Sequence, residues 1–151
     1  MEMNLKMRRL CKDMWHDDRP VPLARELRQL LDAGFTRVAD CVLLTSQMAL
    51  TRSVSPDDFP DRTGYECFVN HLHLEEYFGD SIDQLELATQ GVAFARRLKE
   101  ELDSFAAGER FMVILAISEV ECNVRFHKMR HGEEWVAPDL DKYPEAILAL
   151  S

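Results

Sequence analysis

Residues 109–151 read ERFMVILAISEVECNVRFHKMRHGEEWVAPDLDKYPEAILALS, and this stretch decides the fold. Its first part, residues 111–118, is apolar on both alternating faces. A strand that is apolar on both sides is covered on both sides, so the pattern predicts a strand in the interior of a sheet. Residues 122–128 alternate between apolar and polar side chains, which is typical of a half-buried strand. The short link between the two segments predicts a hairpin.

Two shorter patterns predict the rest of the sheet. Residues 146–150 are an apolar run of strand length. Residues 65–74 also alternate, with Phe68, Leu72 and Leu74 on one face, which predicts another strand. We therefore expect an antiparallel sheet of about four strands.

The helices are predicted from apolar side chains at helical spacing. The longest covers residues 81–107, begins with Ser81 as a capping residue and ends before Gly108. Residues 3–16 and 22–33 predict an N-terminal helical part. The long helix is expected to pack against the sheet.

The predicted fold class is α+β, with residues 1–151 forming a single domain. Residues 36–52 are ambiguous, because residues 41–45 also fit a short buried strand. The length of the segment favours a helix. Residues 53–64 contain two prolines and a glycine among polar residues, which predicts an exposed loop.

The formal charge of −9 is unevenly distributed. Residues 53–90 contain nine Asp and Glu but one basic residue, Arg62, a local charge of −8 (1 − 9). Acidity on this scale repels nucleic acid and anionic lipid and accelerates encounter with a basic partner, so neither nucleic acid nor membrane is expected as a partner. The alternative is that these carboxylates form an ordinary solvated surface.

Other features narrow the class of protein. No apolar run is long enough to span a bilayer, and the N-terminus lacks the apolar core of a signal peptide, so a cytoplasmic protein is expected. The four cysteines are far apart and predict buried small apolar residues. No glycine-rich phosphate loop, nucleotide fingerprint or nucleophile elbow is present, and no cofactor is expected.

The C-terminal third resembles the tail of immunity proteins from bacterial polymorphic-toxin systems. The matching residues are Val124-Arg125-Phe126-His127-Lys128, Arg130, Gly132, Glu133, Trp135, Asp139-Leu140, Tyr143 and Glu145-Ala146-Ile147-Leu148, with a weaker similarity at residues 67–78. These immunity proteins accompany contact-dependent inhibition or Rhs-type toxins and protect the producing cell. The resemblance implies a protein without catalytic activity that neutralises a cognate toxin domain.

Many toxins of such systems are nucleases with basic grooves, so an acidic surface could occlude one by taking the place of phosphates. The carboxylates expected to steer and bind the partner are Asp57, Asp58, Asp61, Glu75, Glu76, Asp80 and Asp83, with Glu133, Glu134 and Asp139 as a second patch. Trp135 is either a binding hot spot among these carboxylates or a lid that folds back on the open face of the hairpin.

Two further interpretations remain open. A small hydrolase could use His127, His131 and Glu133 for acid–base chemistry, with Arg125 or Arg130 holding an anion. No sequence spacing fixes the geometry of these residues. We therefore favour the interpretation that they belong to an ordinary solvent-exposed strand face and loop rather than to an active site. A regulatory or adaptor subunit that binds no toxin would share the surface properties of an immunity protein.

Two histidines in the predicted strand 65–74 could approach one metal ion. His71 and His73 are two residues apart and would share a strand face, and a third ligand would come from His127, His131 or Glu76. No established zinc-binding spacing accompanies them. We therefore favour a structural role for both histidines and predict no metal site.

Overall fold

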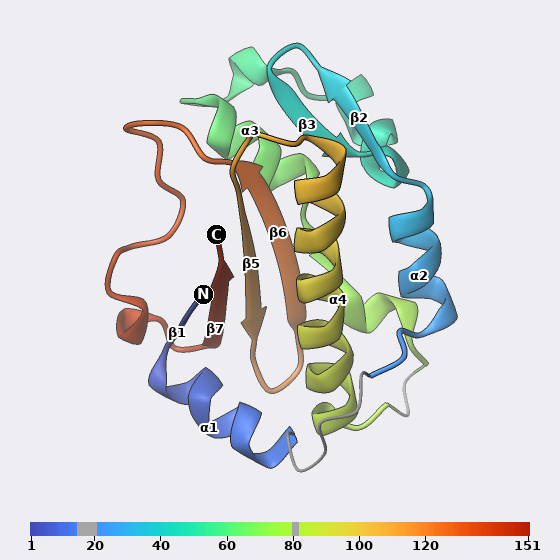
Figure 1. Cartoon of the computed structure of the whole chain (residues 1–151), viewed down its shortest axis with the longest axis vertical. Coiled ribbons are helices and arrows are strands. Elements are labelled where there is room, and N and C mark those ends of the chain that lie inside the picture. Colours follow the sequence, from blue (N-terminus) through green and yellow to red (C-terminus); the bar gives the residue numbers. More distant parts are fainter. Residues whose placement is uncertain (15–20, 80–81) are drawn as a thin grey trace.

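The computed structural model describes residues 1–14, 21–79 and 82–151. The main sheet in this part of the chain has five antiparallel strands in the order β1-β7-β5-β6-β4 (Figure 1). The strands are β1 (Glu2–Met3), β4 (Leu72–His73), β5 (Phe111–Ile117), β6 (Cys122–Lys128) and β7 (Ala146–Leu150). β5 lies between β6 and β7, as its two apolar faces predict. The predicted hairpin forms, with Ile117 paired to Cys122 next to the turn.

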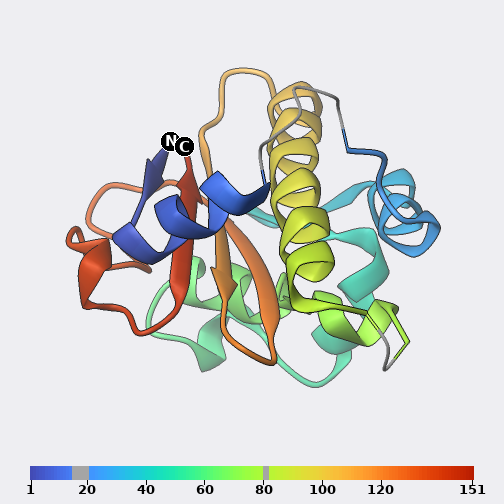
Figure 2. The same ribbon diagram turned by 90° about the horizontal axis from the view of Figure 1, so that it is seen from below.

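Helices cover both faces of this sheet. They are α1 (Leu5–Met14), α2 (Arg25–Asp32), α3 (Arg62–Val69) and α4 (Gln84–Phe105). Figure 2 shows α4 on one face, here called the first face, and α3 on the opposite, second face. The predicted α+β class and the long helix on the sheet are therefore confirmed. Among the described residues, no helix is both long enough and apolar enough to cross a membrane.

The first face carries the largest apolar core, formed by α4 with the inward side chains of β5, β6 and β7. α4 starts at Gln84, and its cap is Asp83, which accepts the Glu86 N–H at 2.9 Å. The predicted cap, Ser81, lies outside the described residues. Gly91 allows close approach, because a Cβ there would lie 2.5 Å from the Cys122 sulfur on β6.

Residues 36–52 do not form the favoured helix. They contribute to a two-stranded sheet, β2 (Phe35–Val38) and β3 (Cys41–Leu44), followed by the 3-10 helix η1 (Thr45–Arg52). All four residues of β3 are buried, which explains why a short, continuously apolar strand is stable here. The alternative of a buried strand at residues 41–45 was the correct one.

The predicted strand at residues 65–74 is also wrong, except at β4. The first half of this segment, residues 65–69, belongs to α3, which begins at Arg62 within the predicted loop 53–64. Asp61 caps α3 by accepting the Gly64 N–H at 2.6 Å. Tyr65 and Val69, four residues apart, are buried together, whereas Phe68 is 47% exposed. The apolar spacing thus fits a helix as well as a strand, and the Asp61 cap decides between them.

Two buried polar residues, Glu66 of α3 and Asn70 at the C-terminal cap of this helix, join the small sheet to β6; we call this pair the α3 clamp. Glu66 is fully buried, and its carboxylate accepts the backbone N–H groups of Val42 (2.7 Å) and Lys128 (2.8 Å). Asn70 accepts from the Leu44 N–H at 2.9 Å and donates to two backbone carbonyls, one on β3 and one on β6. The side chains of α3 therefore hydrogen-bond to the edges of β3 and β6 as a neighbouring strand would.

Candidate functional site

The carboxylates predicted to bind a partner separate into groups, and the largest group surrounds the N-terminus of α3. Glu133 accepts the Thr63 N–H at 3.0 Å, which brings the segment after β6 against the start of α3. Segments about 70 residues apart thus form one surface. We call it the α3 acidic group: Asp57, Asp58, Asp61, Glu133 and Glu134.

The other predicted carboxylates lie elsewhere. Glu75 accepts the Cys122 N–H at 2.9 Å, which places it and the adjacent Glu76 beside the start of β6. Gln84, next to Asp83, donates to the Ser118 carbonyl at the same end of the sheet.

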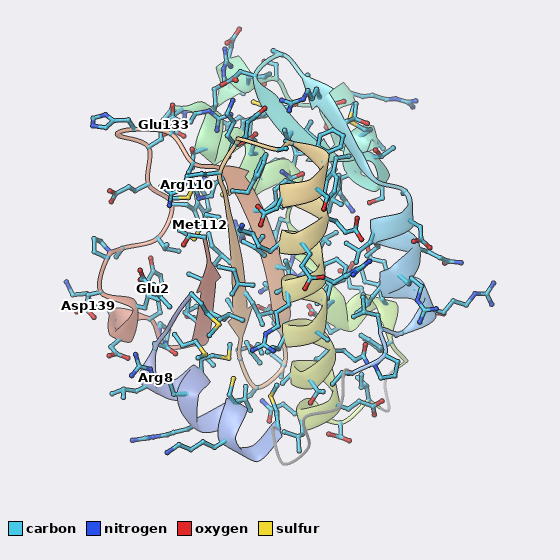
Figure 3. All side chains as sticks on the ribbon, viewed as in Figure 1. Glu2, Arg8, Arg110, Met112, Glu133 and Asp139 are labelled. Atoms are coloured by element: carbon cyan, nitrogen blue, oxygen red, sulfur yellow. The ribbon has the colours of Figure 1, made fainter. Side chains whose placement is uncertain are left out.

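The predicted second patch is split. Figure 3 shows Glu133 and Asp139 at opposite ends of the loop 129–145. Asp139 caps the short 3-10 helix η4 (Leu140–Lys142) through the Asp141 N–H, near the N-terminal segment. Asp80 lies outside the described residues.

Several carboxylates of the α3 acidic group also have a local structural role. Asp61 caps α3, and Asp58 accepts the Ser55 N–H at 2.7 Å. Asp57, with a side chain 91% exposed, makes a long contact of 3.5 Å with Arg62, and Glu134 is exposed. Asp57 and Glu134 can therefore be changed with little effect on the fold.

An aromatic pair adjoins the α3 acidic group. Phe59, two residues before Asp61, packs on Phe68 with ring centroids 5.3 Å apart. Phe68 remains 47% exposed. The sequence pattern predicts Phe68 on a strand face with Leu72 and Leu74 and does not indicate this surface. The Asp61 cap is the signal that would place Phe68 on the outside of a helix.

A second feature is a pocket of about 360 Å³ on the second face of the sheet, beside the loop 129–145. Its floor consists of side chains that point to the same side of β5, β6 and β7 and of the adjoining turns, as the strand register requires. We call it the sheet pocket, and its lining includes Ile114, Ala116, Asn123, Arg125, Ile147 and, on the loop side, Trp135.

Arg125 is the cation of the sheet pocket. Its guanidinium lies 5.4 Å from the centre of the Trp135 ring and donates to His71 Nε2 at 3.2 Å. No described carboxylate forms an ion pair with it. Burial lowers the pKa of Arg125 below its ordinary value. Trp135, 40% exposed, lies over the open face of the hairpin, where the lid interpretation places it.

The two histidines predicted to share a strand face do lie together. The rings of His71 and His73 have centroids 4.2 Å apart, and His73 Nδ1 is 3.2 Å from a Glu75 carboxylate oxygen. Burial, assisted by the positive charges of Arg125 and His73, lowers the pKa of His71 to about 4, so His71 is neutral at pH 7. Within the described ranges, no three His, Cys, Asp or Glu side chains are grouped so as to hold a metal ion.

The residues of the hydrolase interpretation are engaged separately. His127 is 4% exposed and its Nδ1 contacts the Lys128 carbonyl at 3.0 Å, while His131 is exposed. Glu133 is occupied by the N-terminus of α3, and Arg130 binds Glu66 of the α3 clamp at 2.7 Å. In the described part of the chain, no hydrogen bond links any two of the three proposed acid–base residues.

Comparison with known proteins identifies a family but no relative of known function. No curated protein and no solved structure matches this chain. One family model matches residues 2–151, almost the entire sequence. The chain therefore belongs to the family described as Uncharacterized protein PM0498 family.

Proposed function

We propose that this protein is an immunity-type binding protein, which neutralises a cognate toxin domain by covering a basic surface of that domain. The observation that carries the proposal is the α3 acidic group, in which two distant segments converge beside an exposed aromatic ring. In this proposal the protein acts in the cytoplasm of the producing cell.

The charge of this surface suits a basic partner. The five carboxylates of the α3 acidic group are accompanied by Arg62, whose contact with Asp57 is long at 3.5 Å. The nearby Arg130 is engaged by Glu66 and Asp40, so its charge is largely neutralised. An acidic surface of this kind accelerates association with a basic protein and favours the correct orientation.

The aromatic pair offers an apolar contact, which charge alone does not provide. Exposed carboxylates contribute mainly to the rate of encounter, whereas buried aromatic side chains contribute most of the affinity at protein interfaces. Phe68 is exposed and supported by Phe59, so it can be buried by a partner without rearrangement of α3. The α3 clamp ties the same helix to β3 and β6 through hydrogen bonds.

The proposal predicts that a toxin-like domain is encoded beside this gene, and the test uses that domain. Association would be measured by biolayer interferometry at low and high salt for the wild type and for a variant carrying Asp57→Lys and Glu134→Lys. We expect the variant to associate at least about tenfold more slowly at low salt and to show a weaker salt dependence. Phe68→Ala should mainly accelerate dissociation.

The matched control carries Asp32→Lys and Glu119→Lys, which change the net charge equally at exposed positions of α2 and the β5–β6 turn. This control should associate nearly as fast as the wild type. If both double variants slow association equally, net charge rather than the α3 acidic group is responsible. If the wild type neither binds the neighbouring domain nor protects cells that express it, the immunity proposal is wrong.

A further inference from the structure

The sheet pocket is a site of a different kind from the α3 acidic group, because it is hollow and has two oppositely charged ends. Arg125 lies at one end, opposite Ile114 in the β5–β6 register. Glu121 and Glu145 lie at the other end, each directly before the strand residue that pairs with Ile117. Glu121 precedes Arg125 by four positions along extended chain, a span of about 13 Å between their Cα atoms.

The floor between these two ends is mainly apolar. Ala116 is paired with Asn123 on one side and with Ile147 on the other, so these three side chains form the middle row. The Asn123 amide donates to Glu121 at 3.2 Å. Its carbonyl oxygen is buried beside His71.

The charged ends restrict the chemistry of the ligand. Arg125 presents a planar guanidinium without a carboxylate partner among the described residues, and this group matches a carboxylate in shape and charge. A dianion such as phosphate suits the pocket less well, because the site provides one arginine and two glutamates. The glutamates instead favour a positive group at the far end of the ligand.

We propose that the sheet pocket binds a basic amino acid with a free carboxylate, either the free molecule or the C-terminal residue of a peptide. The carboxylate pairs with Arg125, the side-chain ammonium lies near Glu121 and Glu145, and the methylene stem packs on the apolar floor. Lysine, a compact charge on a flexible four-carbon stem, fits this arrangement. The pocket volume of about 360 Å³ is at the lower end of the range for small-molecule sites.

The first experiment compares three ligands on the wild-type protein by isothermal titration calorimetry. L-lysine carries both charged ends, norleucine lacks the side-chain ammonium, and 1,5-diaminopentane lacks the carboxylate. We expect saturable binding of L-lysine with a Kd below about 1 mM and at least about tenfold weaker binding of the other two. Equal binding of L-lysine and 1,5-diaminopentane, or no binding of L-lysine, would overturn the proposal.

Substitutions then test which end of the sheet pocket binds the carboxylate of the ligand and which binds its ammonium group. Arg125→Gln should remove the preference for L-lysine over 1,5-diaminopentane, and Glu121→Gln with Glu145→Gln should remove the preference over norleucine. Arg110→Gln, at an exposed arginine next to β5, is the control and should change neither preference. A preference for L-lysine that survives Arg125→Gln would refute the assignment, and the wild-type series decides the question if a variant does not fold.

The source of the carboxylate is distinguished with peptides. The peptide Gly-Gly-Ala-Lys with a free C-terminus should bind if the natural ligand is a chain end, and its C-terminal amide should not. Binding of L-lysine without binding of this peptide assigns the pocket to the free amino acid. In a Trp15→Phe background, Trp135 is the only tryptophan, so its fluorescence reports whether the ligand reaches Arg125.

Discussion

Two polar regions lie along β6, one at its C-terminal end beneath α3 and one around Arg125 in the middle of the strand, and the protein partners them in opposite ways. At the C-terminal end, both carboxylate oxygens of Glu66 accept hydrogen bonds, and Asn70 makes three. In the middle of the strand, Arg125 has a histidine nitrogen and an aromatic ring as neighbours but no described carboxylate as an ion-pair partner. The C-terminal region is closed by α3, and the region around Arg125 opens into the sheet pocket.

This difference separates a structural role from a functional one. A buried charge whose hydrogen bonds are all made within the protein joins elements together, and loss of its partner is costly. A partly buried charge without an ionic partner contributes little to folding, since its desolvation is not repaid. A charged side chain that lacks its full set of partners within the protein is expected at a site where a ligand supplies the missing partner. The α3 clamp thus belongs to the fold, and Arg125 to a binding site.

The largest expected effect comes from removing the buried carboxylate of Glu66 at the C-terminal end of β6. Glu66→Ala removes the acceptor for the Val42 and Lys128 N–H groups and for the Arg130 guanidinium, so we expect a loss of about 3–5 kcal/mol in the free energy of unfolding. Urea-induced unfolding measures this loss. Glu76→Ala, at an exposed position, should change stability by less than about 0.5 kcal/mol. A loss below about 1 kcal/mol for Glu66→Ala would show that water replaces the carboxylate.

A substitution on the first face of the sheet provides a reference that changes only apolar packing. Gly91→Ala places a methyl group 2.5 Å from the Cys122 sulfur, so α4 or β6 must shift. We expect a net loss of about 1–3 kcal/mol by urea unfolding, although alanine favours the helix by about 1 kcal/mol. In a Cys122→Ala background the same substitution should cost much less. An equal cost in both backgrounds would exclude the sulfur contact as the cause.

Around Arg125, the pH dependence of stability provides a second test of the comparison between the two regions. The pKa of His71 is about 4 in the folded protein, against about 6.5 for an unfolded histidine. Between these values the unfolded chain binds a proton that the folded chain does not, so stability falls as pH drops from about 6.5 towards 4. Because the site is partly solvated, we expect only about 1–2 kcal/mol from His71.

The measurement is urea unfolding at pH 7 and pH 5 for the wild type and His71→Gln. The wild type should lose more stability between these two pH values than the variant. Burial also lowers the pKa of His127, but His127 is present in both proteins, so its contribution cancels. An identical pH dependence of the two proteins would contradict the assignment.

The smallest expected effect is at Arg125 itself. Arg125→Met should change the free energy of unfolding by less than about 1 kcal/mol without ligand, because the lost contact with Trp135 is offset by removal of a poorly solvated charge. Thermal or urea unfolding would show this. A loss above about 3 kcal/mol would mean that Arg125 is structural, like Glu66, and would remove the contrast between the two regions.

The sequence predicts most of the first face because its patterns are long and regular. β6 and β7 begin and end where alternation and the apolar run place them, and the interior of the long helix is buried as its spacing indicates. The ends of that helix are less regular: Leu85 and Phe105 belong to its apolar stripe but are 45% and 42% exposed. At the ends of an element, the surrounding structure no longer covers every position of a periodic pattern.

The second face was harder to predict because its segments are short. Residues 65–74 and 36–52 contain apolar spacings that fit more than one element, and tertiary packing selects among them. The helix cap at Asp61 was the local signal that could have identified α3. Glu66, the centre of the α3 clamp, was counted as one more surface carboxylate, since nothing in its neighbours along the chain shows that it is buried.

Sequence alone determined the α+β class, the central hairpin, the long helix and the excess of acidic residues, because these depend on periodicity and composition within short stretches. Only the tertiary structure decided which carboxylates meet at the N-terminus of α3, that Glu66 is buried, and that Arg125 lies under Trp135 in a pocket with an acidic far end. Such contacts depend on strand register and on packing between residues that are distant in the chain. Local pattern carries little information about either.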